Sequence, residues 1–355
     1  VLFVQGIDPN LKAFIETHLW DALLAVPVHE PNFNSFKAHA LGVKAEFRRD
    51  VYESDRFKES GLLHLVGHSH LDIVYQWPHR EYIRKIGRTH ATMLRLMEQY
   101  PQFKFSQSSA KIYADMKEHY PNVYEQVKQR IAEGRWQPVG AFWLEPDCNL
   151  ISGESFVRHI LHGQRFWMQE FGFQSQVCWL PDVFGISWAL PQILVRSGIK
   201  VLLSNKFFVW NDTNPWRQNT FYWEGADGSR VLTVIPPGHF IGMVDPDHMQ
   251  QYWQDYTEKE TLGECIYTYG WGDGGGGVDP EMLECAIRYN DFPGVVPTRF
   301  SQPENALLRI ATLVDEDALE LPIWSDELYL EAHRGTYTTK GRLKKLNRVS
   351  EVLLR

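Results

Sequence analysis

The sequence predicts an α/β domain built on a largely parallel sheet, and three observations lead to this prediction. From Leu62 onward, short apolar runs alternate with longer amphipathic segments, which is the pattern of βαβ units. The chain has 355 residues, 44% of them apolar and 23% charged, as expected of a globular protein with a substantial core. Polar motifs follow several predicted strands directly, where parallel sheets gather their ligands. We therefore expect a functional site at one edge of the sheet.

Three regions follow one another along the chain. Residues 1–60 are predicted to be an N-terminal helical segment, with apolar residues at helical spacing and a break at Pro27–Phe33. Residues 61–320 contain the alternating strands and helices. Residues 321–355 become basic and helical and stop in mid-pattern at Leu353–Arg355, so we expect this last region to be truncated inside a helical element.

The elements of the central region are predicted from periodicity and from breaking residues. Apolar residues at helical spacing predict a helix at 80–100, Pro121 interrupts another at 110–133, and Gly172 ends a third at 154–171. Strands are predicted at 62–66, 103–105, 136–142, 177–180, 200–204 and 265–269. The remaining elements are a helix at 191–197, a helix near 247–262, a glycine loop at 270–277 and a last α/β repeat at 281–313. Asp227-Gly228 between two apolar runs predicts a β-hairpin.

Charge and composition exclude several classes of protein. A net charge of −8 argues against nucleic acid or an anionic membrane surface as partner, and no apolar run is long enough to span a bilayer. The four cysteines lie far apart without a CxxC pair, which predicts a reducing, cytoplasmic environment. The 13 Trp, 15 Tyr and 20 Phe would suit a cleft in which aromatic rings stack on sugars. The sequence leaves homo-oligomerisation open.

The most informative motif follows the first strand, at Gly67-His68-Ser69-His70-Leu71-Asp72. If the chain remains extended, side chains two apart share a face, so His68, His70 and Asp72 would point the same way. Two imidazoles and a carboxylate at a strand end are suited to a divalent metal, most plausibly zinc. The alternative is that these histidines only cap turns or bond to the backbone.

Four further motifs combine carboxylates, aromatic residues and glycines. They are Trp179–Gly185 with Asp182, Trp143–Asp147 followed by Ser152–Ser155, Gly272–Gly277 with Asp273, and His333–Thr338. Each also has a purely structural explanation. In the same order, these are an N-cap or turn aspartate, a surface loop, a mobile glycine loop without a P-loop lysine, and a helix start with a satisfied histidine.

In their order along the chain, these five motifs resemble glycoside hydrolase family 38, the zinc-dependent α-mannosidases, and in particular its cytosolic or bacterial branch. The resemblance runs from about residue 60 to Arg355. It implies a distorted parallel (β/α) barrel for residues 61–320, and it makes residues 321–355 the start of a helical bundle. It also implies hydrolysis of terminal α-mannosidic bonds with retention of configuration, a bound Zn²⁺ ion, and an α-mannoside or mannose-containing oligosaccharide as substrate.

The resemblance assigns roles to individual residues. His70, Asp72 and Asp182 match the metal ligands, and Asp182 also matches the catalytic nucleophile. Asp273 is the candidate general acid/base. A retaining mechanism requires two carboxyl groups about 5–5.5 Å apart, and a cation beside Asp182 would keep that carboxyl ionised.

Three residues are implied to contact the substrate. Tyr75 stands where the family usually has a tryptophan that stacks on the sugar, and an aromatic ring is retained. Lys206 stands where the Golgi enzymes carry an arginine near the substrate. Asp147 matches an acidic position in the Trp-rich motif.

The family's second zinc-binding histidine would lie beyond residue 355, and His333 belongs to a different motif. We therefore expect the isolated chain not to be a competent enzyme, with the apolar face of its last helix exposed. Two alternatives stay open: a zinc-dependent hydrolase of the amidohydrolase kind, which would need more histidines at later strand ends, and a non-catalytic carbohydrate-binding fragment.

Overall fold

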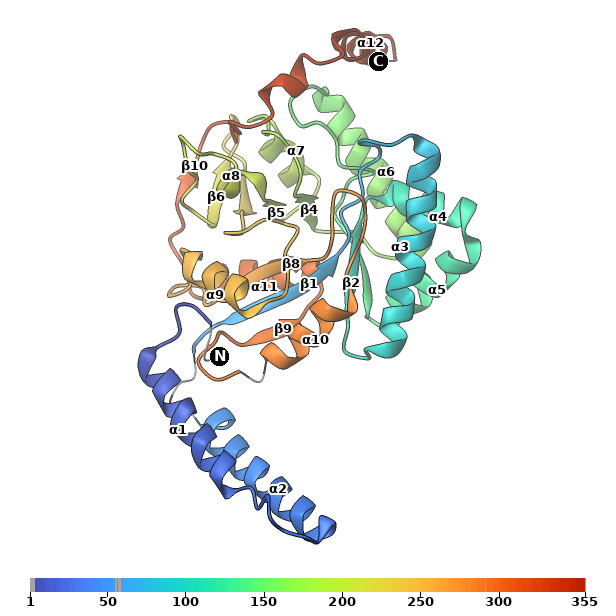
Figure 1. Cartoon of the computed structure of the whole chain (residues 1–355). Helices are drawn as coiled ribbons and strands as arrows, with labels where there is room; N and C mark the ends of the chain where they lie inside the picture. The colour runs from blue at the N-terminus through green and yellow to red at the C-terminus, as the bar shows by residue number, and fades with distance from the viewer. Residues whose placement is uncertain (1–3, 55, 57–58, 291, 355) are drawn as a thin grey trace.

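The centre of the molecule consists of strands that run mostly parallel to one another, with helices around them (Figure 1). The computed structural model describes residues 4–54, 56, 59–290 and 292–354. The strands are β1 (Leu62–His68), β2 (Phe105–Ser108), β3 (Trp136–Val139), β4 (Val177–Leu180), β5 (Val201–Ser204), β6 (Thr220–Glu224), β7 (Arg230–Val234), β8 (Glu264–Tyr269), β9 (Thr298–Phe300) and β10 (Ile323–Trp324).

The strands form two five-stranded sheets. In the first, the order is β3-β2-β1-β8, and β9 pairs with the early part of β1; all of these pairs are parallel. In the second, the order is β10-β6-β7-β5-β4, and only β6 and β7 are antiparallel. The Ala141 N–H donates to the Val177 carbonyl at 3.0 Å and joins the end of β3 to β4. The two sheets thus meet between β3 and β4.

The helices cover the sheets and form both ends of the chain. They are α1 (Pro9–Ala25), α2 (Phe33–Phe47), η1 (Arg48–Tyr52), α3 (His79–Gln99), α4 (Ala110–His119), α5 (Pro121–Ala132), α6 (Gly153–Phe171), α7 (Leu190–Arg196), α8 (Lys206–Val209), α9 (Pro246–Asp255), α10 (Pro280–Tyr289), α11 (Pro303–Glu316), η3 (Arg334–Tyr337) and α12 (Gly341–Leu353).

Local sequence accounts for the main boundaries between these helices. Pro121 begins α5 and separates it from α4, because its ring fixes φ and it lacks an N–H to continue the preceding helix. Gly172 ends α6 in the left-handed region, at φ 75°. On α3, one face is buried against the sheet, including Tyr82, Ile86 and Met93.

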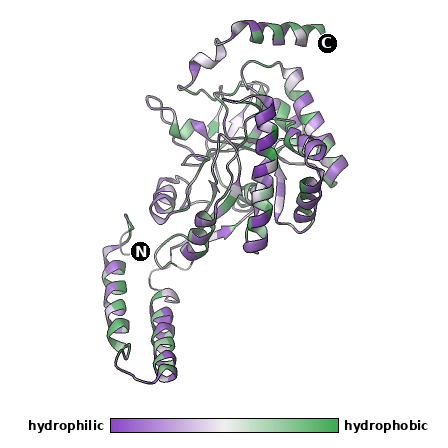
Figure 2. Ribbon diagram, turned by 45° about the vertical axis from the view of Figure 1, so that its right-hand side comes forward, coloured by the Kyte–Doolittle hydropathy of each residue, from purple (hydrophilic) through white to green (hydrophobic). Residues whose placement is uncertain are grey.

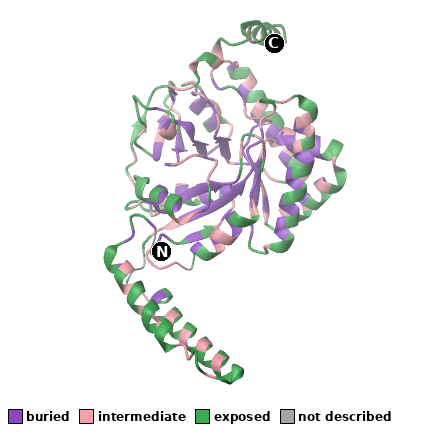
Figure 3. Cartoon of the chain, in the orientation of Figure 1, coloured by how far each residue is buried: buried purple, intermediate pink, exposed green. Residues whose placement is uncertain are grey.

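Burial is concentrated in the strands and on the inner faces of the surrounding helices (Figure 3). The largest apolar cluster joins α3, α4 and α10 to β1, β2 and β8. A second cluster fills the space around β4, β5, β6 and α7, and a third lies where α11 crosses the two sheets. The residues of β4 and β5 are buried throughout, as expected of parallel strands that are covered on both faces.

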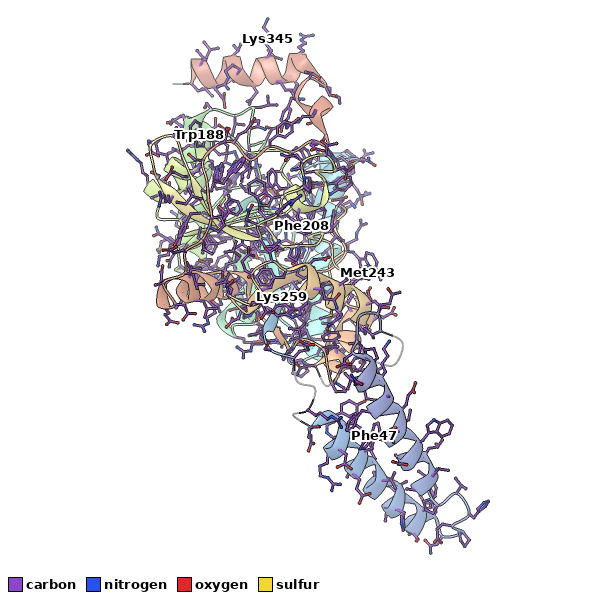
Figure 4. All side chains as sticks on the ribbon, turned by 90° about the vertical axis from the view of Figure 1, so that its left-hand side faces the viewer. Phe47, Trp188, Phe208, Met243, Lys259 and Lys345 are labelled. Atoms are coloured by element: carbon purple, nitrogen blue, oxygen red, sulfur yellow. The ribbon has the colours of Figure 1, made fainter. Side chains whose placement is uncertain are left out.

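The first two helices and the last helix extend from this body at opposite sides (Figure 1). α1 and α2 form a long hairpin at one end, whereas α12 lies beyond the other (Figures 1 and 4). Apolar and polar residues alternate along the hairpin (Figure 2). Several of its apolar side chains are exposed, among them Trp20, Leu23 and Leu24. Within the described residues, no helix combines the length and apolarity needed to cross a membrane.

The prediction of an α/β domain with a parallel sheet is confirmed. The pairing of the described strands gives two sheets, and the closed barrel and the helical bundle stay predictions. Because neighbouring parallel strands end at the same edge, the loops after β1, β3, β4 and β8 come together. These are the loops that carry the polar motifs.

Candidate active site

Four predicted residues meet where the strands end. One ligand atom from each of His70, Asp72, Asp182 and Asp273 lies within 4.8 Å of the others. His70 and Asp72 follow β1, Asp182 follows β4, and Asp273 follows β8. Residues separated by as many as 203 positions are therefore brought together by the two sheets, and the cluster combines one imidazole with three carboxylates.

His70 is the centre of this cluster. Its Nε2 atom lies 3.1 Å from Asp182 Oδ2 and 3.3 Å from Asp72 Oδ1. Its other ring nitrogen, Nδ1, lies 3.8 Å from Glu145 Oε2, and only 5% of the side chain is exposed. Burial alone lowers the pKa of His70, but hydrogen bonds with Asp182 and Asp72 outweigh it and hold that pKa well above the ordinary value.

Asp182 is held between two cationic side chains and a backbone contact. The ammonium of Lys206 lies 2.5 Å from Asp182 Oδ1, and His70 approaches the other oxygen. The Asp182 N–H donates to Glu145 Oε1 at 2.8 Å. Burial favours the neutral acid, but His70 and Lys206 outweigh that effect and lower the pKa of Asp182. The carboxylate is therefore kept ionised.

Lys206 begins α8 directly after β5, and its side chain is almost fully buried. Its ammonium lies 5.1 Å from the ring centre of Phe184, 5.4 Å from that of Trp210 and 5.8 Å from that of Phe240. Such ring faces stabilise a cation from which water has been removed. These rings therefore help to hold the lysine beside Asp182.

The loop that carries Asp273 is fixed to β1 and α3. Lys85 of α3 donates to the Gly274 carbonyl at 3.1 Å, Thr89 donates to that of Gly275, and Leu71 pairs with Gly274. Gly270 has φ 128°, and a Cβ atom there would lie 2.2 Å from the His68 carbonyl oxygen. Asp273 itself is exposed, so this carboxyl group faces solvent at the mouth of the site.

Four residues considered from sequence lie outside the cluster. His68 donates from Nε2 to the Phe240 carbonyl at 2.6 Å, and burial lowers its pKa to about 4. His333 stacks on Phe184 at 4.8 Å. Asp147 accepts from the backbone N–H groups of residues 149 and 150, and so caps its own turn. Tyr75 is 60% exposed, with its ring edge-on to that of Trp77.

Glu145 is the site residue that the sequence interpretation missed. It belongs to the Trp143–Asp147 motif, in which the resemblance assigns Asp147 as the acidic residue. Burial raises the pKa of Glu145 to about 7, although the nearby His70 opposes the shift. The signal in the sequence was two acidic residues two positions apart after a strand, and spacing alone does not say which of them turns inward.

The donor set fits a divalent cation. His70, Asp72, Asp182 and Asp273 supply one imidazole nitrogen and several carboxylate oxygens, which are ligands that zinc and harder divalent metals accept. So many acidic groups around one buried histidine also create a negative field that a cation would neutralise. Among the described residues, the other group of this kind, Asp115, Glu118 and His119, has its buried carboxylate engaged by Tyr82 and Lys111.

Comparison with known proteins gives a consistent assignment. Residues 60–327 match the family described as "Glycosyl hydrolases family 38 N-terminal domain". The chain is 39% identical over 293 residues to alpha-mannosidase 2C1 of Homo sapiens, covering 82% of this chain and 28% of that protein. It is 38% identical over 308 residues to alpha-mannosidase G of Dictyostelium discoideum, covering 86% and 28%. The chain thus spans less than a third of these relatives' length.

Among solved structures, an alpha-mannosidase from Enterococcus faecalis V583 matches with a TM-score of 0.68 at 20% identity, covering 81% of this chain and 34% of that one. A 4-alpha-glucanotransferase from Thermococcus litoralis matches with a TM-score of 0.51 at 13% identity, covering 77% and 42%. At these identities the likeness concerns the fold.

Proposed function

The chain belongs to glycosyl hydrolase family 38, and from this premise we propose that it hydrolyses terminal α-mannosidic bonds with retention of configuration. The proposed metal is zinc, held by His70, Asp72 and Asp182, and the proposed substrate is an α-mannoside or a mannose-containing oligosaccharide. Relatives named as alpha-mannosidases support the substrate class.

The distance between two carboxyl groups is the observation that carries the proposal. Ligand atoms of Asp182 and Asp273 lie within 4.8 Å of one another. Retaining glycosidases place their two carboxyl groups about 5–5.5 Å apart, whereas inverting enzymes leave about 6.5–9.5 Å for a water molecule. The approach of one Asp182 oxygen to one Asp273 oxygen within 4.8 Å supports the retaining arrangement, in which one carboxylate attacks the sugar directly.

The environments of the two carboxyl groups suit different roles. Asp182 is buried beside Lys206 and His70, which lower its pKa and keep it ionised as a nucleophile for the anomeric carbon. Asp273 is exposed at the mouth of the site, where a leaving group would depart. In the first step, Asp273 gives its proton to the leaving oxygen as Asp182 bonds to the sugar. In the second step, Asp273 takes a proton from the water that releases the sugar from Asp182.

A divalent cation bound in this cluster would hold sugar hydroxyls and favour distortion of the ring toward the transition state. Lys206 is proposed to contact the sugar as well as Asp182, and the exposed ring of Tyr75 is proposed to stack on it. Asp147 is proposed to meet the substrate at the rim. We also propose action in the cytoplasm, supported by four described cysteines that form no disulfide.

Because the isolated chain is expected not to be a competent enzyme, the proposal is tested on a longer protein that contains this chain, assayed with an aryl α-mannoside with and without a chelator. We expect hydrolysis that the chelator suppresses, a first product with retained configuration by NMR, and loss of turnover in Asp182→Asn, since an amide cannot accept the glycosyl group. Glu154→Gln on the exposed start of α6 is the matched control and should retain activity. A product formed first with inverted configuration would contradict the mechanism. Mannose binding without hydrolysis would instead identify a carbohydrate-binding protein.

A further inference from the structure

We infer that Glu145 is a positioning residue that fixes His70 and Asp182 in the arrangement that binds the metal. The inference rests on the metal site of the proposed function. One Glu145 carboxylate oxygen faces His70, and the other accepts a hydrogen bond from Asp182. A single side chain therefore contacts residues that follow two different strands, β1 and β4.

The approach of Glu145 to His70 is electrostatic, at a distance longer than a hydrogen bond, and it favours the ring orientation that turns Nε2 toward the cluster. Nε2 of His70 faces Asp182 and Asp72 at 3.1 and 3.3 Å, whereas Nδ1 faces Glu145 at 3.8 Å. A carboxylate on the far side of an imidazole favours the proton on that side and leaves the opposite nitrogen for a metal. Because the side chains of His70 and Glu145 are only 5% and 18% exposed, water competes weakly for this contact.

The contact with Asp182 fixes its backbone. Pro181 precedes Asp182 and has no N–H, so the Asp182 N–H is the first donor after β4, and it is bound by Glu145 Oε1 at 2.8 Å. The hydrogen bond holds the start of the turn from which the Asp182 side chain reaches His70 and Lys206. A change at residue 145 would therefore move a ligand even if the Asp182 side chain remained intact.

Glu145 is itself held by a rigid segment. The neighbouring Trp143 donates its N–H to the His159 carbonyl at 2.9 Å and accepts from the Lys111 N–H at 2.9 Å. Pro146 follows and restricts the backbone of Glu145 to extended conformations. α4, α6 and a proline thus fix the position from which the carboxylate reaches the cluster. It does so without joining the four residues whose ligand atoms converge.

The test is the Zn²⁺ affinity of Glu145→Ala and Glu145→Gln, measured by competition with a chelating dye, together with the ¹⁵N chemical shifts of the His70 ring. Second-sphere partners of metal-bound histidines typically change metal affinity by about 10- to 100-fold, and we expect a loss in this range for Glu145→Ala. Glu145→Gln keeps an acceptor for the Asp182 N–H but lacks the charge, so its loss should be smaller. The ¹⁵N shift of His70 Nδ1 should change in both variants, because a charged carboxylate no longer faces it. Glu154→Gln should match the wild type.

Zinc affinity of Glu145→Ala within twofold of the wild type, with unchanged His70 ring shifts, would overturn the inference. If that variant does not fold, the isosteric Glu145→Gln decides by the same criterion. If the longer wild-type protein binds zinc but cleaves no α-mannoside, the proposed function is removed and this inference is left standing. Cleavage of mannosides without a bound metal would overturn this inference together with the proposed zinc ion, and would leave the proposed mannoside hydrolysis standing.

Discussion

The ion pair between Lys206 and Asp182 allows a quantitative test of the site's electrostatics. The two side chains are only 8% and 11% exposed, with 2.5 Å between Nζ and Oδ1. Lys206→Met keeps most of the apolar stem that packs among Phe184, Trp210 and Phe240, but removes the charge. Asp182 would then remain as a buried carboxylate with one fewer cationic partner.

The expected loss of unfolding free energy in Lys206→Met follows from the burial of the ion pair. Removing one partner of a buried ion pair costs about 3–5 kcal/mol, because the remaining charge is left without compensation. His70 still lies 3.1 Å from the other Asp182 oxygen, so we expect a value near the lower end, about 3 kcal/mol. The double variant Lys206→Met/Asp182→Asn leaves no unpaired charge, and should recover about 2 kcal/mol relative to the sum of the single variants.

The assay is urea unfolding of the four proteins at pH 7 in the presence of a chelator, so that metal binding does not contribute. Lys117→Met is the matched control, because its ion pair with Glu170 is 2.7 Å long but Lys117 is 52% exposed. That change should cost no more than about 1 kcal/mol. A coupling energy below about 0.5 kcal/mol between Lys206 and Asp182 would refute this account of the site.

Two further predictions concern acid stability and the general acid. Burial lowers the pKa of His90 to about 4, against about 6.5 in an unfolded chain, so the unfolded state binds the proton first as the pH falls. His90 alone should reduce the free energy of unfolding by about 2 kcal/mol between pH 7 and pH 5, and urea unfolding of His90→Leu should show this part of the pH dependence removed. Asp273→Asn should slow cleavage of a mannoside with a poor leaving group by about 100-fold or more, but spare an activated aryl mannoside, as steady-state rates on both substrates would show.

Periodicity and breaking residues were sufficient for most of the fold, because these signals act within a few residues. Pro121 divides the predicted helix into α4 and α5, and Asp227-Gly228 lies in the turn between antiparallel β6 and β7. The pairing of strands that are distant in the sequence could not be predicted in the same way. The approach of β3 to β4 depends on backbone groups of residues 141 and 177, which no local pattern relates.

In the site too, local sequence predicts some features, whereas others depend on contacts between residues that are distant in the sequence. His70, Asp72 and Asp182 follow the ends of two different strands and lie together, and their role as metal ligands stays a prediction. His68 departs from the expectation because β1 ends there, so strict alternation does not continue, and its ring binds the carbonyl of distant Phe240.

The sequence gives some information on which of the two acidic residues, Glu145 or Asp147, turns into the site. Aspartate readily accepts from backbone N–H groups two and three residues on, as Asp147 does, so its turn is a local feature of the sequence. Glutamate forms such turns less readily. The partner of Glu145 is instead the N–H of Asp182, 37 positions away, and only the folded chain identifies it.

Gly270 lies where β8 ends and approaches the backbone of His68 closely, so its substitution should affect both the sheet and the site. Its φ of 128° strains any other residue, and the Cβ of Gly270→Ala would lie 2.2 Å from the His68 carbonyl oxygen. Backbone atoms yield less readily than a flexible side chain, so β1 and β8 must separate just before His70 and Asp273. We expect a cost of about 3 kcal/mol or more in unfolding free energy, and weaker zinc binding. Gly134→Ala is the control, because its φ of 71° is also positive but nothing lies within 4 Å of the added Cβ, so only backbone strain of about 1 kcal/mol should appear. Equal destabilisation of the two variants in urea would show that the close approach of Gly270 to His68 does not constrain the site.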